Sequence, residues 1–297
     1  MLLKKNKDNK AIKIAGLLSE ACSLFKLKKL EVPEMEAELL LAHVLKKDRV
    51  FIMAHPEYLV KPKEVIQFNK LVRARLAGWS SAVLLGTKEF YGLEFKVNKD
   101  VLVPRPETEI LVDTILDYVK SKPEALVMDI GTGSGAIITS LFKNLENKRH
   151  LFYASDKSNK ALIVAKSNAK KYQTEIGFLN GDLLKPYLPI LKRTKPQNIV
   201  IAANLPYLKP SEMKEPSIKK EPKSALLSGS DGLWHYKRLF HQLNYIKDAN
   251  VFLICEINPE QATQIEKLAY ASFPKSKTSF KNDYTGRIRF FILEINI

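Results

Sequence analysis

The sequence predicts an α/β protein: a doubly wound parallel sheet preceded by a small bundle of helices. From residue 107 onward, short apolar segments alternate with amphipathic segments of helical length, which is the rhythm of a parallel sheet covered by helices on both faces. Three closely spaced glycines, Gly131, Gly133 and Gly135, stand between the first apolar segment and the helix that follows. Residues 11–80, in contrast, show only helical periodicity.

The N-terminal part contains three segments whose apolar residues recur at helical spacing. In the first segment these residues are Ile14, Leu17, Leu18, Ala21, Cys22 and Phe25. The second begins at Pro33, whose missing N–H costs nothing in a first helical turn, and its expected buried face is Met35, Leu39, Ala42 and Leu45. The third ends at Gly78 and presents Val65, Phe68, Leu71, Val72 and Leu76. Three such helices predict a small bundle.

The pattern changes near residue 84. Aromatic and β-branched residues alternate with polar ones in the segment TKEFYGLEFKVNKDVLVPRPETE, residues 87–109, which predicts a hairpin. Strands are expected after it at 126–130, 151–155, 176–180, 198–203, 251–257 and 288–295, and helices at 107–120, 135–147, 158–171, 233–246 and 259–272. A Pro- and Lys-rich loop spans 209–224. We therefore divide the chain into a helical domain (1–84), a hairpin linker (85–106) and a sheet domain (107–297).

Composition argues against several classes of protein. No apolar run approaches the roughly 18 residues that a membrane span needs, and the basic N-terminus lacks the apolar stretch of a secretion signal. We therefore expect a cytoplasmic protein without a membrane partner. The five histidines and two cysteines show no metal-ligand spacing, so no metal is expected.

The formal net charge of +16 has two interpretations. A basic protein attracts RNA and other polyanions, but a lysine-rich composition gives the same charge without any such partner. Only nine of the 48 basic residues are arginines, and base readout usually relies on arginine. We therefore expect no specific nucleic-acid partner.

The segment DIGTGSG, residues 129–135, predicts a ligand-binding loop. Glycines permit a tight turn and a close approach of ligand to backbone, and the helix that follows offers free N–H groups at its positive end. We assign to the cofactor site Gly131, Thr132, Gly133, Ser134 and Gly135. The glycines alone also fit a loose dinucleotide pattern, but Asp129 completes D-x-G-x-G-x-G, which resembles the loop of class I methyltransferases.

Two carboxylates follow the next strands. Asp156 ends the second strand, where a carboxylate can take both hydroxyls of a ribose. Asp182 follows the third strand, where it can accept from an adenine amino group, with Leu183 packed beside the ring. Helix N-capping is the alternative for both carboxylates, because each precedes a helical segment. The sequence leaves this choice open.

The fourth strand ends on Asn204-Leu205-Pro206-Tyr207. Buried amides and phenols cost free energy unless something bonds to them, so this tetrapeptide is either an ordinary turn or part of a ligand site. In a doubly wound sheet this strand lies next to the first, and its end opens onto the same crevice as the glycine loop. If the tetrapeptide binds a ligand, we therefore expect it to border the same site as the glycine loop, where Asn204 can also contact the cofactor.

The tetrapeptide resembles the [ND]-P-P-[YF] motif of methyltransferases that act on planar nitrogens, namely adenine N6, cytosine N4 or a glutamine amide. The segment VLVPRPETEILV, residues 101–112, resembles the signature of the protein-(glutamine-N5) methyltransferase family (PrmC/HemK family), which modifies bacterial peptide-release factors. Further segments resemble that family in the same order: YGLEFKVNKDV, EPKSALLSGSDGL, LICEINPEQ and KNDYTGRIRF. The resemblance runs from about residue 35 to the end of the chain.

The resemblance implies a class I methyltransferase fold, a Rossmann-like seven-stranded sheet, with a helical domain that recognises the substrate. It implies that S-adenosyl-L-methionine methylates the glutamine of the Gly-Gly-Gln motif in class-1 peptide chain release factors, leaving S-adenosyl-L-homocysteine. The side-chain oxygen of Asn204 and the carbonyl of Leu205 would hold the amide NH₂, Pro206 would stiffen the loop, and Tyr207 would pack against the amide. We expect a monomer. An adenine-N6 methyltransferase of rRNA or DNA is the alternative, since N-[LI]-P-Y also occurs in rRNA adenine dimethyltransferases.

Two positions depart from the family pattern, and one pair of residues is open to two interpretations. Leu205 replaces the first proline of the motif, which should be tolerated because the backbone carbonyl makes the contact, although the fixed φ of proline is lost. Asn258 stands where the family usually has glycine. Arg105 and Glu107 either brace the two domains or shape a lid over the cofactor pocket.

Overall fold

The computed structural model describes residues 11–145, 149–214, 218–246 and 248–296. They form two compact units. The helical unit comprises the described residues up to Gly86 together with Ile218–Lys220, and the sheet unit comprises the remainder. Three expectations concern residues outside the described ranges, wholly or in part: the basic N-terminus (1–10), the end of the helix at 135–147, and the middle of the loop at 209–224.

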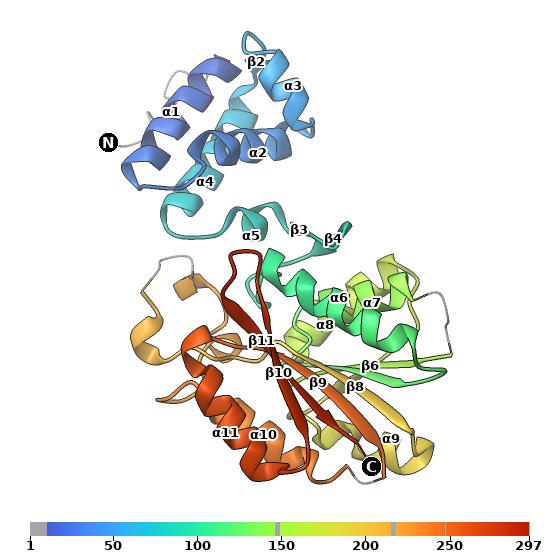
Figure 1. Cartoon of the computed structure of the whole chain (residues 1–297). Coiled ribbons are helices and arrows are strands. Elements are labelled where there is room, and N and C mark those ends of the chain that lie inside the picture. The colour runs from blue at the N-terminus through green and yellow to red at the C-terminus, as the bar shows by residue number, and fades with distance from the viewer. Residues whose placement is uncertain (1–10, 146–148, 215–217, 247, 297) are drawn as a thin grey trace. The chain divides into compact units, whose positions relative to one another are not determined.

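The helical unit is a bundle around one apolar core (Figure 1). Its described helices are α1 (Ile14–Leu27), α2 (Pro33–Leu45), α3 (Arg49–Ala54), α4 (Pro62–Leu76) and α5 (Ser81–Leu85). The two-residue strands β1 (Ile12–Lys13) and β2 (Leu59–Val60) pair antiparallel. The three expected helices are confirmed by α1, α2 and α4. The shorter elements were not expected, because five or six residues do not reveal a period.

The buried face of α2 differs from the expected one. Ala37, Leu40 and Leu41 are fully buried, whereas Met35 is 38% exposed and Leu39 is only half-buried. The expectation of a face through Met35 and Leu39 was therefore wrong. The segment PEMEAELLLAHVL contains apolar residues at several overlapping helical spacings, so periodicity alone does not choose among its faces. Packing against α1 and α4 makes the choice.

The sheet unit contains a seven-stranded sheet in the order β10-β11-β9-β8-β5-β6-β7. Its strands are β5 (Leu126–Ile130), β6 (Leu151–Asp156), β7 (Ile176–Asn180), β8 (Asn198–Ala203), β9 (Asn250–Glu256), β10 (Lys277–Asn282) and β11 (Ile288–Ile295). The strands from β9 to β7 run parallel, and β11 is antiparallel to both of its neighbours. The predicted doubly wound sheet is confirmed. The expected hairpin is formed by β3 (Thr87–Phe90) and β4 (Leu93–Lys96).

Two elements of the sheet unit were not among those expected. The edge strand β10 has the polar sequence KTSFKN, and an edge strand with one neighbour needs little apolar surface. Its six residues therefore do not resemble the apolar runs of the central strands. The helix α9 (Leu188–Thr194) has only seven residues, too few to show a period.

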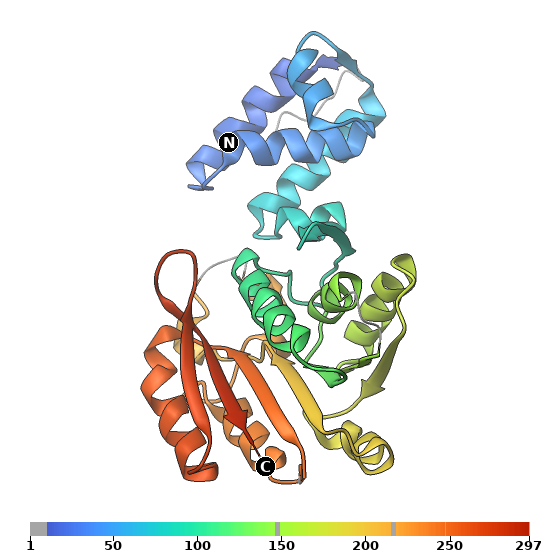
Figure 2. The same ribbon diagram turned by 45° about the vertical axis from the view of Figure 1, so that its right-hand side comes forward.

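Helices cover both faces of the sheet (Figures 1 and 2). On one face lie α6 (Glu109–Lys120), α7 (Ala136–Asn144) and α8 (Asn159–Lys171); on the other lie α9, α10 (Trp234–Leu243) and α11 (Ala262–Ser272). The strands feed two separate cores: Val127 belongs to the core beneath α6 and α7, and its neighbour Met128 to the core beneath α9 and α10. Strands buried on both faces are nearly continuous apolar runs, so most polar groups lie toward their ends.

No helix in the described ranges is long and apolar enough to cross a membrane.

One buried asparagine joins three segments of the sheet unit. Asn168 on α8 is 1% exposed. Its Oδ1 accepts the backbone N–H of Lys96 at 2.8 Å, and its Nδ2 donates to the carbonyls of Lys96 at 3.0 Å and Ser134 at 2.8 Å. The side chain therefore fastens the end of the hairpin and the glycine loop to α8.

Replacing Asn168 by alanine should lower the free energy of unfolding of the sheet unit by about 2–4 kcal/mol, because three backbone groups lose a partner and two carbonyls stay desolvated. Urea denaturation followed by circular dichroism and tryptophan fluorescence measures the loss. Asn144→Ala is the matched control: Asn144 is an exposed residue whose amide donates to the carbonyl of Ser140, and its loss should cost less than about 0.5 kcal/mol. Equal losses in the two variants would contradict the role given to Asn168.

Candidate active site

The candidate site lies where the strand order of the sheet reverses. β5 leads to β6 and β7 on one side, whereas β8 and β9 lie on the other. Ile130 at the end of β5 pairs with Ala203 at the end of β8, so the glycine loop and the Asn204–Tyr207 tetrapeptide leave the sheet side by side. Ligands of doubly wound sheets bind at this switch point.

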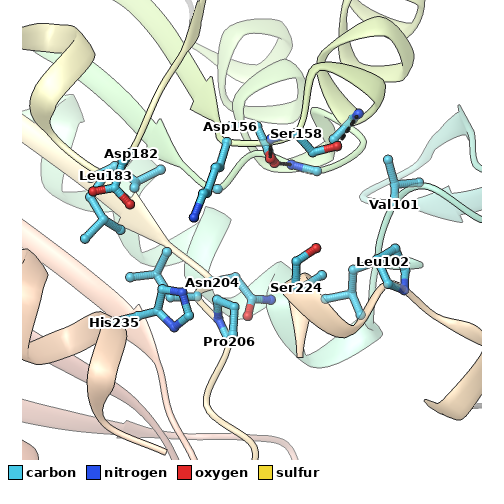
Figure 3. Close-up of a pocket in the computed structure, with 18 of the residues that line it drawn as sticks. Val101, Leu102, Asp156, Ser158, Asp182, Leu183, Asn204, Pro206, Ser224 and His235 are labelled. Atoms are coloured by element: carbon cyan, nitrogen blue, oxygen red, sulfur yellow. Dashed lines mark hydrogen bonds between the residues drawn. The ribbon is translucent and has the colours of Figure 1, made fainter. Parts of the chain in front are cut away.

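A cavity of about 320 Å³ opens there, within the usual range for small-molecule sites. Eight of the residues assigned from the sequence line it: Gly131, Gly133, Asp156, Asp182, Leu183, Asn204, Leu205 and Pro206. Figure 3 shows Asp156, Asp182, Asn204 and His235 arranged around this cavity. Thr132 and Ser134 line a smaller adjoining cavity of about 50 Å³, which Gly131, Gly133 and Asn204 also border.

The backbone of the glycine loop explains its glycines. Gly131, Gly133 and Gly135 have φ values of +74°, +55° and +78°, in the left-handed region that side chains disfavour. A Cβ on Gly135 would lie 3.1 Å from Cβ of Ala165 on α8, so the loop can approach α8 only without a side chain there. Gly135 is the N-cap of α7 and does not line the described cavities. Its role here is to set the path of the loop.

A buried carboxylate on β5 is hydrogen-bonded to the glycine loop. Asp129 is fully buried, and its Oδ2 accepts the hydroxyl of Thr132 at 2.6 Å. The hydroxyl of Tyr187 donates to the backbone carbonyl of Asp129 at 3.0 Å. Burial raises the pKa of Asp129 to about 7, and the charge of Asp156 contributes in the same direction. The loop is thus anchored by hydrogen bonds to the strand from which it leaves.

Asp156 faces the glycine loop and does not cap a helix. Its Oδ2 accepts the backbone N–H of Gly133 at 2.9 Å, and its Oδ1 accepts that of Ser158 at 2.8 Å. The N-cap of α8 is Ser158, whose hydroxyl oxygen accepts from Ala161 at 3.2 Å. Burial raises the pKa of Asp156. Since a carboxylate has about four acceptor sites, it keeps acceptor capacity for ligand hydroxyls.

Asp182 is held by α10. Its carboxylate is paired with Arg238 and also accepts from Nε2 of Gln242 at 3.3 Å, so its side chain is engaged by α10 instead of capping the following helical turn. Leu183, beside it, has a φ of +52°. Such a conformation costs a leucine free energy and persists only where its surroundings enforce it. The turn after β7 thus holds Asp182 and Leu183 in the wall of the cavity.

Asn204 is oriented by a carboxylate that we did not expect. Its Nδ2 donates to Oε2 of Glu256 at 2.9 Å and to Oγ1 of Thr108 at 3.2 Å, and the Thr108 hydroxyl donates to the same Glu256 oxygen at 2.7 Å. Because a carboxylate can only accept, the nitrogen of the Asn204 amide must face it. In the described part of the chain Oδ1 of Asn204 has no donor, and it remains available to a ligand.

The other residues of the tetrapeptide have different surroundings. Leu205 is buried, and its side chain approaches Gly131. The hydroxyl of Tyr207 donates to Oε1 of Glu256 at 3.3 Å, and its carbonyl accepts from Nε2 of Gln261 at 3.0 Å. Tyr207 is not part of the described cavity lining. Its packing against a substrate amide stays a prediction.

Arg105 forms an ion pair with Glu221, which rules out the first of the two interpretations, a brace between the domains. Nη2 of Arg105 lies 2.8 and 2.9 Å from the two carboxylate oxygens of Glu221. Both residues belong to the sheet unit, so the pair does not brace the two units. It ties the segment 100–105 to the segment 221–225, and both segments contribute to the cavity wall. This contact favours the interpretation as a lid.

Sequence reasoning missed three functional candidates: Thr108, Glu256 and His235. The sequence could have indicated Glu256, because it is the one charged residue of the apolar strand β9 (NVFLICE). It stands at the carboxyl end of that strand, next to the end of β8. Thr108 lay within the PRPETE segment but carried no signal of its own. His235 had none, because its neighbours in sequence do not reveal which side of α10 faces the cavity. The described residues contain no group of histidine, cysteine or carboxylates able to hold a metal ion.

His235 lines the cavity with a fixed and neutral ring. Its Nδ1 lies 2.8 Å from Oγ of the buried Ser228, which also accepts the backbone N–H of His235 at 3.1 Å. Because Ser228 already accepts that backbone proton, we assign its own proton to Nδ1, which places the ring proton on Nε2. Burial, helped by the charge of Arg238, lowers the pKa of His235 to about 4.

The His235 ring should titrate near pH 4 and stay neutral from pH 6 to 8. Because an unfolded histidine titrates near 6.5, the unfolded chain binds more protons between pH 6.5 and 4, and this residue makes the fold lose stability as the pH falls through that window. NMR titration of its Cε1–H signal, assigned by its loss in His235→Gln, measures the midpoint. A midpoint near 6.5 would contradict the buried neutral ring.

The order of the seven strands, with a glycine loop beside Asn204-Leu205-Pro206-Tyr207, defines a class I methyltransferase. The chain is 32% identical over 268 residues to the release factor glutamine methyltransferase of Bacillus anthracis, covering 88% of this chain and 93% of that protein. It is 35% identical over 263 residues to the protein of that name from Bacillus subtilis, covering 86% and 89%. The chain belongs to the release factor glutamine methyltransferase family.

Two further comparisons concern the N-terminal segment and the fold. Residues 16–86 match the family described as the PrmC N-terminal domain. The solved structure of the hMettl16 catalytic domain in complex with MAT2A 3'UTR hairpin 6 is 17% identical, with a TM-score of 0.51, covering 76% of this chain and 81% of that chain. At that identity the likeness concerns the fold alone.

Proposed function

We propose that this enzyme transfers the methyl group of S-adenosyl-L-methionine to the side-chain nitrogen of the glutamine in the Gly-Gly-Gln motif of class-1 peptide chain release factors. Membership of the family, across most of the chain, supports the substrate class. The observation that carries the chemistry is the orientation of Asn204, whose nitrogen is held by Glu256 and Thr108 while its oxygen stays available at the cavity.

The residues present fit the methyl donor. The glycine loop leaves its backbone open to a ligand: apart from Gly133 and its two chain neighbours, no atom of the described residues lies within 4 Å of where a Cβ of Gly133 would stand. Asp156 would take the ribose hydroxyls, and Asp182 with Leu183 would border the adenine. When bound, S-adenosyl-L-methionine supplies an electrophilic methyl group on a sulfonium. The glycine loop and the strand ends would hold it in the cavity that Asn204 also lines.

Orientation and charge stabilisation by the chain's own residues would then account for catalysis. An amide nitrogen is a weak nucleophile because its lone pair is delocalised into the carbonyl. Oδ1 of Asn204 and the carbonyl oxygen of Leu205 would accept the two N–H groups of the glutamine and stabilise the positive charge that grows on its nitrogen. Fixing the nitrogen in line with the methyl group can contribute up to about 7–11 kcal/mol. Pro206 would stiffen this loop, and Tyr207 would support the amide plane.

The helical unit is proposed to hold the release factor away from the reacting residue, in keeping with the division into a recognition domain (1–84), a linker (85–106) and a catalytic domain (107–297). The enzyme would act as a monomer in the cytoplasm, where release factors are found. Its net charge of +16 would then reflect lysine-rich composition and general attraction to ribosomal surroundings, without base-specific contacts.

Incubation of the protein with labelled methyl donor and either a class-1 release factor or ribosomal RNA tests the substrate. Label is expected in the release factor and not in the RNA. A release factor with glutamic acid in place of the Gly-Gly-Gln glutamine is the matched control and should remain unlabelled. Label in RNA alone would overturn the proposal in favour of an adenine-N6 methyltransferase.

Asn204→Ala should lower kcat by about 10²- to 10³-fold, the size of loss seen when one group that stabilises transition-state charge is removed. Affinity for the methyl donor, measured by calorimetry, should change little. Asn198→Ala, at the opposite end of β8, removes an exposed amide that donates to the carbonyl of Glu124 at 3.2 Å and should leave kcat unchanged. Weak donor binding with a normal rate at saturation would show that Asn204 serves the donor only.

A further inference from the structure

Glu256 is a buried carboxylate whose side-chain partners all come from the candidate site. It is 3% exposed and ends β9, next to the end of β8. Three groups donate to its two oxygens: the Thr108 hydroxyl at 2.7 Å, Nδ2 of Asn204 at 2.9 Å and the Tyr207 hydroxyl at 3.3 Å. Asn204 and Tyr207 belong to the tetrapeptide, and Thr108 belongs to the PRPETE segment.

Stability alone does not account for a carboxylate at this place. Burying one costs free energy even when it is hydrogen-bonded, and apolar residues fill all other interior positions of β9 from Val251 to Cys255. Burial raises the pKa of Glu256, while the Thr108 hydrogen bond and the charge of Arg289 oppose the rise. All three of its side-chain partners are donors, which is the arrangement that an ionised carboxylate requires.

We propose that Glu256 is a positioning residue for methyl transfer: by holding Nδ2 of Asn204, it presents Oδ1 of the same side chain to the NH₂ of the substrate. This inference rests on the proposed function of Asn204. The two ends of an asparagine amide have nearly the same shape, and a flipped amide would offer a donor to the substrate's own donor. A carboxylate at Nδ2 excludes the flip, because Oδ1 would then face a negative charge.

The negative charge of Glu256 has a second effect, on the hydrogen bond that Oδ1 of Asn204 would accept from the substrate. Hydrogen bonds in series polarise one another, so a carboxylate accepting from Nδ2 increases the negative charge on Oδ1 of Asn204. That oxygen then stabilises more strongly the positive charge that develops on the substrate nitrogen. Thr108 completes the arrangement, since its Oγ1 accepts from Nδ2 of Asn204 and its proton goes to Glu256.

Glu256→Gln tests the proposal, because glutamine keeps the shape and the acceptor but loses the charge. It should lower kcat for release-factor methylation by roughly 10- to 100-fold, the range expected for a hydrogen bond to a charged group, with unchanged donor affinity and a melting temperature at or above that of the parent protein. The matched control is Glu266→Gln on α11, where the carboxylate also accepts a threonine hydroxyl, that of Thr278 at 3.1 Å, away from the site. The control should keep the parent kcat.

A spectroscopic readout separates this inference from the proposed function. The side-chain amide signals of Asn204 in a ¹⁵N–¹H spectrum, assigned by their loss in Asn204→Asp, should move upfield in Glu256→Gln and stay in place in Glu266→Gln. If the parent protein fails to methylate the release factor, the proposed function fails, and these amide signals still decide whether Glu256 polarises Asn204. Unchanged signals, or a parent-like kcat in Glu256→Gln, would overturn the inference.

Thr108→Val provides a second test if Glu256→Gln does not fold. It removes the other acceptor of Nδ2 and leaves the carboxylate in place. We expect kcat to fall several-fold with little change in donor affinity, and Thr108→Ser, which keeps the hydroxyl, to restore it. Loss of donor binding in place of loss of kcat, or failure of serine to restore the rate, would contradict the role of this network.

Discussion

The parallel pairing of β5 with β8 is the constraint on which the site depends. Because Ile130 and Ala203 are register partners, the glycine loop and the tetrapeptide begin at the same level of the sheet, one strand apart. Apolar cores on both faces hold these strands rigidly, and no polar group for chemistry can be placed within them without cost. The strand ends are therefore where binding and reaction groups collect, and their relative position is inherited from the register.

Buried carboxylates then connect the loops to this frame. Asp129 accepts from Thr132 within the glycine loop, Glu221 pairs with Arg105 beside the cavity, and Glu256 gathers Thr108, Asn204 and Tyr207. Burial raises the pKa of all three acids, which measures the free-energy cost of placing them there. Each offsets part of that cost with donors from the surrounding loops, so the same hydrogen bonds that make burial tolerable also fix the loops in place.

The candidate site was predictable from the sequence wherever its residues lie next to a strand end. Gly131, Asp156, Asp182 and Asn204 each follow an apolar run closely, and the alternation of strands and helices brings such ends to one edge of a sheet. Thr108 and Glu256 were missed because they act through contacts with Asn204, which lies 96 and 52 residues away from them in the sequence. His235 was missed because its ring is fixed by Ser228, seven residues away. The strand β10 and the buried face of α2 were missed for a related reason: neighbouring elements, not local periodicity, decide them.

The sequence by itself determined the class of fold, the order of its main elements and the positions of the glycine loop and the tetrapeptide at strand ends, because these depend on local pattern and on spacing along the chain. Only the tertiary structure decided which atom of the Asn204 amide is held by Glu256, which partner Arg105 takes and which acid lies behind the tetrapeptide. Those outcomes depend on the directions of hydrogen bonds between segments far apart in the chain, and periodicity carries no information about direction.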